Sequence, residues 1–483
     1  MSLRREFVSG VFYTAISKYA GIIIGIVISA ILSRLLAPKD FGVLGLSGVF
    51  ISFFGIFSEL GIGTAIVQRK DLTKEELNNI FSFTVYQGLI LAVLFFLSSY
   101  IFADIYHSEI LRPICQVMSL NLFFGSFSIV SGALITREKR FRFLAVRNLT
   151  IQVVFGVISI IAALLGAGLW ALVISGVGGG IASSLVNYFT KPLKFHIKID
   201  SRPLRSIASY SFYQFAFGTT NFFYRNLDNL LIGKYLNMTE LGYYQKSYSL
   251  MLQPVDNLTR VVSPVLQPVL ADYQNNPTFI EEKYNKLLKS LSIFGFPISV
   301  ILLLNAKEII LILFGNQWVG AILPFQILAV SIGFQVIMST TGSIFQVLNN
   351  TRLLFWVGLS NTIICIACLL IGLFVIGTLE GVSLMFTLMN FLICYNWPLM
   401  YHKLFHSSIR SFWKAIEPGI RASLILLIFC LPLYFLLLDS NLILSLTIKL
   451  IYSVCILLLS YHFMHILNIT ELYKKIRAKI IRR

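Results

Sequence analysis

Long apolar runs constrain this chain more than any other feature of its sequence. Hydrophobic residues make up 57% of its 483 residues, and charged residues only 12%. A run of about 20 apolar residues is long enough for a helix to cross a bilayer, and a water-soluble fold cannot bury this much apolar surface. The sequence therefore predicts an all-α polytopic membrane protein with fourteen transmembrane helices. We place the spans at 10–33, 41–67, 80–102, 114–136, 148–166, 168–190, 207–233, 241–271, 288–304, 321–347, 353–376, 381–401, 421–438 and 442–467.

The basic residues predict how these spans are oriented. The chain has 39 Lys and Arg residues and a net charge of +18. If the N-terminus is cytoplasmic, most of them fall in cytoplasmic segments, and the outward loops hold Arg34, Lys39, Arg112, Lys234 and Lys307. The positive-inside rule then places both termini in the cytoplasm. Because topology and anionic membrane lipids account for the charge, no nucleic-acid partner is predicted.

Short hydrophilic segments divide the chain into predicted domains. Residues 1–190 form a lobe of six helices, and a basic cytoplasmic linker at 191–206 separates it from a second six-helix lobe at 207–401. A cytoplasmic loop at 402–420 leads to two further helices at 421–467, which lie outside the repeat. The basic tail at 468–483 is predicted to face the cytoplasmic surface of the membrane.

A sequence pattern recurs after 200 residues. Arg34-Leu35-Leu36-Ala37-Pro38-Lys39-Asp40-Phe41-Gly42 and Lys234-Tyr235-Leu236-Asn237-Met238-Thr239-Glu240-Leu241-Gly242 share a base, an apolar pair, an acid and a glycine at matching places. Each stretch joins one long apolar helix to the next. A duplicated helical bundle in a membrane chain is typical of a transporter whose path lies between two pseudo-symmetric halves.

Polar and small residues also form stripes on four of the helices. Their spacings of three and four place each stripe on one helical face. A charge at the bilayer centre costs about 2.5–3.5 kcal/mol, so we expect the stripes to line a central cavity between the first, second, seventh and eighth helices. In that order of helices, the stripes are Thr14, Lys18, Gly21, Gly25 and Ser29; Gly45, Gly48, Ser52, Gly55, Glu59 and Gly63; Gln214, Gly218, Asn221, Arg225, Asp228 and Asn229; and Lys246, Ser249, Gln253, Asp256, Arg260, Ser263 and Gln267.

The charged stripe residues have alternative interpretations. Arg225 and Asp228, or Asp256 and Arg260, are close enough along a helix to form local ion pairs. Lys18, Glu59 and Lys246 lie within a few turns of a span end and can reach the interface, and the same snorkelling is predicted for Lys449 in the last span.

Two further helix features are expected to act on packing and shape. Gly21 and Gly25 form a small-residue face that lets another helix approach. Pro254, Pro264 and Pro268 are expected to kink the eighth helix.

Motifs for catalysis are absent from the sequence. It contains no G-x-x-x-x-G-K-S/T, no H-E-x-x-H and no dense His/Cys/Asp cluster, so we predict no nucleotide hydrolysis, no metal and no cofactor. A polysaccharide-forming enzyme would need paired carboxylates on a sizeable outer loop, whereas the densest outer acidic pair is Asp104 and Glu109. A non-enzyme is therefore predicted, with an envelope-polysaccharide glycosyltransferase or polymerase as the alternative of another class.

Four motifs together resemble one family. The sequence resembles the polysaccharide transporters, or oligosaccharidyl-lipid flippases, of the multidrug/oligosaccharidyl-lipid/polysaccharide exporter superfamily, in particular their teichuronic-acid and colanic-acid type. The matching segments are Arg34-Leu35-Leu36-x-Pro38-x-x-Phe41-Gly42, Ile135-Thr136-Arg137-Glu138-Lys139-Arg140-Phe141, Leu241-Gly242-Tyr243-Tyr244 and Phe314-Gly315-x-x-Trp318.

The resemblance implies a function in the bacterial inner membrane. Such a protein moves an undecaprenyl-diphosphate-linked oligosaccharide from the cytoplasmic to the outer leaflet by alternating access, with separate glycosyltransferases and a polymerase as possible partners. The polyprenyl tail would stay in lipid or lie in a groove beside the last two helices. A cation-coupled multidrug exporter of the same superfamily is the alternative within the class.

The stripes supply candidate site residues for this function. A diphosphate needs fixed cations, for which arginine is well suited. The candidates are Arg225, Arg260, Lys246 and Lys18 for the diphosphate; Tyr213, Gln214, Asn221 and Gln253 for the sugar; and Asp256, Asp228 and Glu59 for ion coupling.

Overall fold

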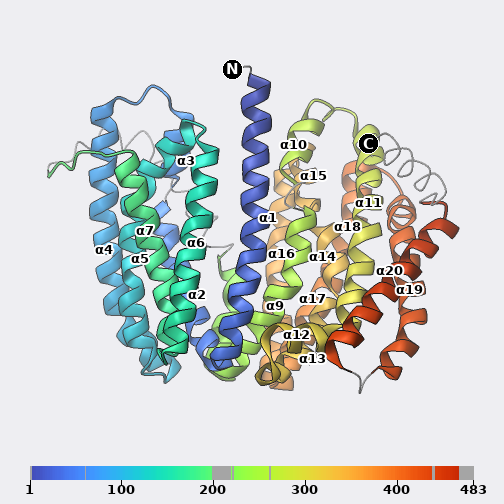
Figure 1. Cartoon of the computed structure of the whole chain (residues 1–483). Coiled ribbons are helices and arrows are strands. Elements are labelled where there is room, and N and C mark those ends of the chain that lie inside the picture. The colour runs from blue at the N-terminus through green and yellow to red at the C-terminus, as the bar shows by residue number, and fades with distance from the viewer. Residues whose placement is uncertain are drawn as a thin grey trace, which may run out of the picture. The chain divides into compact units, whose positions relative to one another are not determined.

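The computed structural model describes residues 3–59, 61–197, 219, 222–259, 263–437 and 441–466. This part of the chain consists of helices and their connections and contains no strand (Figure 1). The chain divides into two compact units, Met1–Gly242 and Tyr243–Arg483. The lobes predicted at 1–190 and 207–401 are a different division, and their bounds stay a prediction.

The first unit is a bundle of long helices with one short helix. Its core is an apolar cluster between α3, α4 and α5, in which Ile66, Ile80 and Val130 are fully buried. The helix α5 packs against both α4 and α7 (Figure 1). The helices are α1 (Leu3–Leu35), α2 (Pro38–Glu59), α3 (Ile62–Gln68), α4 (Lys74–Tyr106), α5 (Leu111–Arg137), α6 (Phe141–Leu164) and α7 (Leu169–Thr190), followed by a helical stretch at 222–235.

Local sequence explains where α4 and α7 begin. Thr73 caps α4 by accepting a hydrogen bond from the Glu76 N–H, while the Glu76 carboxylate accepts one from the Thr73 N–H. The turn between α6 and α7 needs positive φ angles, and Gly166 and Gly168 supply them at 85° and 55°. The Thr73 cap and the two glycines therefore allow short connections before α4 and between α6 and α7.

The second unit contains shorter helices, several of them broken. Its core surrounds the large buried side chains Tyr284, Trp397, Tyr401 and Phe412. Its helices are α9 (Met238–Thr259, which begins in the first unit), α10 (Ser263–Ala271), α11 (Pro277–Leu304), α12 (Ala306–Phe314), η1 (Asn316–Ala321), α13 (Ile322–Ala329), α14 (Ile332–Met338), α15 (Thr341–Val347), α16 (Thr351–Leu370), η2 (Ile371–Ile376), α17 (Leu379–Leu392), η3 (Ile393–Tyr395), α18 (Asn396–Met400), η4 (Tyr401–Phe405), α19 (Arg410–Leu436) and α20 (Leu442–Phe463).

Eleven helices of the described residues are long and apolar enough to span a membrane. A pair bent by 50°, Asn316–Ala329 with Ile332–Val347, raises the number to twelve if it forms one span. About half of the predicted seventh span falls outside the described residues. The predicted eighth span contains α9 and α10, with residues 260–262 between them outside the description, and it is not among these apolar spans. A multi-pass membrane protein is therefore confirmed, whereas the number fourteen stays a prediction.

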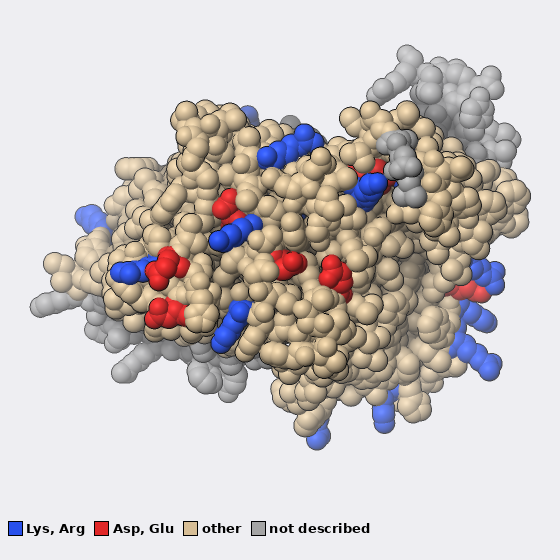
Figure 2. All heavy atoms as spheres, turned by 90° about the horizontal axis from the view of Figure 1, so that it is seen from below, with Lys and Arg blue, Asp and Glu red and all other residues tan. Residues whose placement is uncertain are grey.

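The end of the protein that carries the α1–α2 and α4–α5 connections has few charges. Figure 2 shows acidic and basic side chains scattered over this face among mainly uncharged residues. This face is the one that the sequence predicts to lie outside the cell, because its loops hold few Lys and Arg residues.

Candidate functional site

The structure describes only part of the predicted site. Four of the candidates lie outside the described residues: Tyr213, Gln214, Asn221 and Arg260. Glu59 is the last residue of α2, but its side chain also lies outside the description. The structure describes the six remaining candidates: Lys18, Arg225, Asp228, Lys246, Gln253 and Asp256.

The small-residue stripe of α2 lies on a face that no described side chain covers closely. A methyl group added at Gly48 or at Gly55 would have no heavy atom within 4 Å outside its own helix backbone. The other side of α2 is packed, with Val43, Leu46 and Ser47 all buried. The α2 face that carries Gly48 and Gly55 is therefore not packed against another described helix at these two positions, which is a condition for the predicted cavity lining.

The polar stripe of α9 is likewise on the uncovered side of its helix. The buried residues of α9 follow helical spacing and face the interior of their unit: Tyr244, Ser247, Met251, Val255 and Thr259. Between them, Ser249 and Gln253 are exposed, and Lys246 and Asp256 are partly exposed. The predicted division of α9 into a packed face and a polar face is therefore present in the structure.

Lys246 is anchored among aromatic rings at the start of α9. Its Nζ lies 4.8 Å from the ring centre of Phe314 and 5.6 Å from that of Trp318. A cation over an aromatic face is attracted by the ring quadrupole. Phe314 and Trp318 thus hold the Lys246 side chain in place.

Two motifs that are far apart in the sequence meet at this point. The Tyr243 ring packs edge-on against Trp318 at 6.0 Å, and its hydroxyl donates to the Gln317 carbonyl at 3.2 Å. The Ser247 hydroxyl donates to the Ala321 carbonyl at 2.8 Å. The segment Phe314-Gly315-x-x-Trp318 therefore fixes the first turns of α9 and, with them, Lys246.

The stripe of α1 differs from the other two, because part of it is covered by α6. Gln152 of α6 donates from Nε2 to the Gly21 carbonyl at 2.8 Å, and its amide also lies against Gly25. The expectation that Gly21 and Gly25 serve helix packing is confirmed. Since these two glycines face α6, the α1 stripe does not line a cavity along its whole length.

Arg225 and Asp228 differ in exposure within the helical stretch 222–235. The Arg225 side chain is exposed, whereas Asp228 is 9% exposed. Asp228 accepts hydrogen bonds from the backbone N–H and the side-chain amide of Asn229, at 2.8 and 3.0 Å. Asp228 is therefore a buried acceptor in its own helix.

The structure corrects the prediction for Lys449, which does not reach the interface. Lys449 of α20 and Glu308 of α12 are 4% and 3% exposed, and they form an ion pair in which Lys449 donates to Glu308 Oε1. The Ser445 hydroxyl donates to the same oxygen at 2.9 Å, and Lys449 Nζ lies 4.7 Å from the Tyr434 ring centre. Sequence reasoning missed this pair because its members are 141 positions apart.

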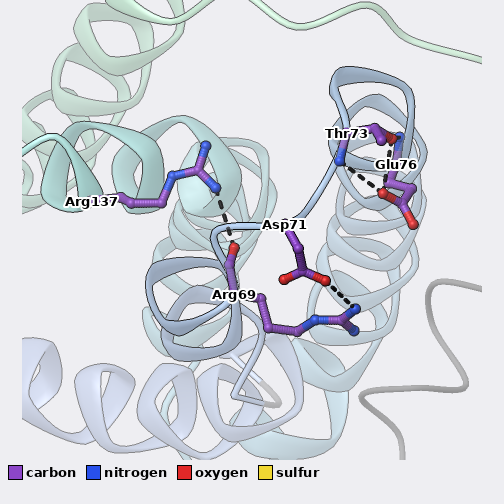
Figure 3. A network of polar contacts seen from close by, with 5 residues as sticks. All are labelled: Arg69, Asp71, Thr73, Glu76 and Arg137. Carbon is purple, nitrogen blue, oxygen red and sulfur yellow. Dashed lines mark hydrogen bonds and ion pairs between the residues drawn. The ribbon is translucent and has the colours of Figure 1, made fainter.

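The predicted motif after the fourth span forms part of a polar connection (Figure 3). Arg137 at the end of α5 donates to the Arg69 carbonyl at 3.3 Å, and Arg69 pairs with Asp71 at 2.9 Å. The guanidinium of Arg69 lowers the pKa of the Asp71 carboxyl through their hydrogen bond. This network joins the α3–α4 and α5–α6 connections, which indicates a structural role for the motif.

No group of three or more His, Cys, Asp and Glu residues that could hold a metal occurs among the described residues. The prediction that the protein has no cofactor is not tested by this observation. The polar groups of the candidate site can form hydrogen bonds and charge contacts with a polar or anionic ligand.

Comparison with known sequences gives consistent results. Residues 31–323 match the profile of the family described as polysaccharide biosynthesis protein. The chain is 26% identical to the lipopolysaccharide biosynthesis protein WzxC of Escherichia coli (strain K12), covering 81% of this chain and 80% of that protein. It is 24% identical to the teichuronic acid biosynthesis protein TuaB of Bacillus subtilis (strain 168), covering 74% of each. It is 22% identical to the succinoglycan biosynthesis transport protein ExoT of Rhizobium meliloti (strain 1021), covering 84% and 82%.

Comparison with solved structures shows the fold. The structure of the lipid II flippase MurJ in an inward closed conformation matches with a TM-score of 0.75 at 14% identity, over 94% of this chain and 99% of that one. An inward-facing multidrug resistance transporter of the MATE family matches with a TM-score of 0.59 at 16% identity, over 80% and 96%. At these identities, the likeness establishes a shared helical fold.

Proposed function

Because this chain belongs to the family of polysaccharide biosynthesis proteins, we propose that it is a flippase for a lipid-linked oligosaccharide. The ligand is a sugar chain joined through a diphosphate to a polyprenyl lipid such as undecaprenol. The protein would carry it from the cytoplasmic to the outer leaflet of a bacterial cytoplasmic membrane by alternating access, with both termini in the cytoplasm.

One observation supports this proposal most directly: the polar stripe of α9 and the small-residue stripe of α2 lie on faces that packing leaves uncovered. A membrane helix that presents polar groups away from its packed side needs water or a polar ligand there, because lipid does not solvate them. The transport role in the name of ExoT and the flippase fold of MurJ agree with this interpretation.

The proposed division of labour follows the chemistry of each group. Lys18, Arg225, Lys246 and Arg260 would contact the diphosphate, which needs charge-assisted hydrogen bonds once it leaves water. Tyr213, Gln214, Asn221 and Gln253 would contact the sugars. Glu59, Asp228 and Asp256 are the proposed ion-coupling acids. The protein itself would make and break no bond, and glycosyltransferases and a polymerase would act before and after it.

The decisive experiment is deletion of the gene in its natural host. We expect the surface polysaccharide to disappear and its lipid-linked repeat unit to accumulate on the cytoplasmic face, accessible to an added glycosidase only after the membrane is opened. Complementation with the intact gene should restore the polymer. Normal polymer in the deletion strain, together with altered drug tolerance, would instead support an exporter of small molecules.

A further inference from the structure

The first unit contains a groove lined by α1, α6 and α7, together with Phe41 of α2. Its volume is about 360 Å³, and it is bordered mainly by apolar and small side chains. The lining includes Gly25, Ser29 and Leu32 of α1, Ile151, Gln152 and Phe155 of α6, and Leu172, Ser175 and Gly179 of α7. Only Gln152 among these carries a polar group larger than a hydroxyl, and its amide donates to Gly21 of α1. An occupant of this groove must therefore be largely apolar.

The helices α1 and α6 run in the same direction along the groove. The Ser17 hydroxyl contacts the Ala145 carbonyl at 3.5 Å, Gln152 contacts Gly21, and Ile28 packs on Gly156. Residue numbers rise together along both helices, so α1 and α6 are parallel and their N-terminal ends lie at the same end of the groove.

Basic residues continue the groove towards this end. On α1, Lys18, Gly25, Ser29 and Leu32 follow one another by steps of seven, four and three residues, which place Lys18 in line with the groove. On α6, Arg147 precedes Ile151 and Phe155 by successive steps of four. With 1.5 Å of rise per residue, Lys18 is about 10 Å along the helix from the groove residue Gly25.

Arg147 is held in position from α7. It donates to the Asn187 side-chain oxygen and, from Nε at 3.2 Å and NH2 at 2.7 Å, to Asn148. These bonds are to neutral amides, so they orient the guanidinium without cancelling its charge. Among the described residues, no carboxylate pairs with Lys18 or Arg147. The end of the groove is therefore basic, while the groove itself is apolar.

Resting on the flippase function proposed above, we propose that the α1–α6–α7 groove is a docking site for the polyprenyl diphosphate part of the substrate. The isoprenoid chain lies in the groove, and Lys18 and Arg147 bind the diphosphate at its N-terminal end. Charge complementarity selects this occupant, because a neutral lipid would leave the charges of Lys18 and Arg147 without an anionic partner. The groove holds the lipid part of the substrate, and Lys18 is one of the four cations assigned above to the diphosphate.

Photocrosslinking of the purified full-length protein tests this site. The probe is a polyprenyl diphosphate with a benzophenone on its chain, presented in nanodiscs of phosphatidylethanolamine. We expect labelled peptides from α1, α6 and α7, and competition by unmodified polyprenyl diphosphate. Uncharged polyprenol should compete much less, and phosphatidylglycerol should not compete. Equal competition by phosphatidylglycerol would assign the groove to ordinary anionic lipid and overturn the proposal.

Matched variants test the two parts of the site separately. Ser175→Phe fills the groove and should lower labelling about tenfold. Its control is Ile174→Phe on the neighbouring exposed position of α7, outside the groove lining, which should leave labelling unchanged. Lys18→Gln should lower labelling about tenfold by removing one charge-assisted contact, and Lys18→Arg should restore most of it. Labelling that survives both Ser175→Phe and Lys18→Gln would overturn the proposal.

The deletion experiment keeps this test distinct from the test of function. If polymer export needs the gene but the groove is not labelled, the docking site is wrong and the flippase function stands. If the deletion strain exports polymer normally, the function itself is wrong, whatever the groove binds.

Discussion

Gly42 and Gly242 contact each other through a reciprocal arrangement of backbone. A Cβ added at Gly42 would overlap the Met238 carbonyl and lie 3.1 Å from the Gly242 nitrogen. A Cβ added at Gly242 would overlap the Pro38 carbonyl and lie 3.3 Å from the Gly42 nitrogen. Every member of this contact has its counterpart 200 positions away. The two copies of the repeated sequence motif therefore pack against each other with local pseudo-two-fold symmetry, in the first turns of α2 and α9.

This contact predicts that neither glycine tolerates a side chain. Gly42→Ala or Gly242→Ala forces the two backbones apart, and we expect a loss of at least about 1–3 kcal/mol of stability, as for overpacking in a core. The measurement is thermal unfolding of the detergent-purified protein, followed by size-exclusion chromatography. Gly48→Ala in the same helix is the control, because its added methyl meets open space. Equal unfolding temperatures for all three variants would contradict the close contact.

The buried pair of Glu308 and Lys449 predicts a clear double-mutant result. Lys449→Met leaves the Glu308 charge buried without its partner, which should cost about 3–5 kcal/mol. The double variant Glu308→Gln with Lys449→Met contains no buried charge and should regain most of this stability. Lys286→Met, in the exposed pair with Glu282, should have no measurable effect. If the double variant is as unstable as Lys449→Met, packing rather than the unpaired charge explains the loss.

Lys246 is predicted to act on transport rather than on folding. Lys246→Gln keeps a polar side chain but removes the cation, so we expect export to fall about tenfold through one lost charge-assisted contact. The unfolding temperature should remain close to that of the parent. Lys246→Arg should retain most of the export, and Lys234→Gln, at an exposed position, should retain all of it. Surface polymer per cell, normalised to the amount of protein in the membrane, is the measurement.

The proposed contact of Arg260 with the diphosphate can be separated from a pairing with Asp256. Arg260→Ala removes a charge-assisted contact of about 1.5–3 kcal/mol and removes the possible partner of Asp256. The double variant Asp256→Asn with Arg260→Ala removes both charges together. If Arg260 binds the diphosphate, the double variant should reach the membrane at normal levels and still fail to export. Restored polymer would mean that Arg260 only neutralises Asp256.

Asp256 is also the proposed coupling acid, and transport into membrane vesicles tests this role. We expect translocation of the lipid-linked unit to depend on a proton or sodium gradient in the parent protein. Asp256→Asn should abolish that dependence, because an amide does not bind and release a proton or hold a sodium ion as a carboxylate does. Translocation by the parent protein that ignores both gradients would remove the coupling role.

The amino-acid sequence alone determined the features that depend on composition and short-range periodicity. Runs of apolar residues fixed most spans, because a bilayer selects helices by length and apolarity. The 200-residue repeat indicated the equivalence of Gly42 and Gly242, and spacings of three and four predicted which side of α9 is polar. A short glycine face on α1 indicated close packing, although it did not name the partner helix.

Only the tertiary structure decided which distant residues meet. The partner of Lys449 is Glu308, the partner of Gly21 and Gly25 is Gln152, and Tyr243 packs against Trp318. Each choice depends on how helices far apart in the sequence cross, and periodicity within one helix contains no information about that crossing. A buried lysine and one that reaches the interface look alike in an apolar run, because the difference lies in whether a carboxylate from another helix occupies the same low-dielectric space.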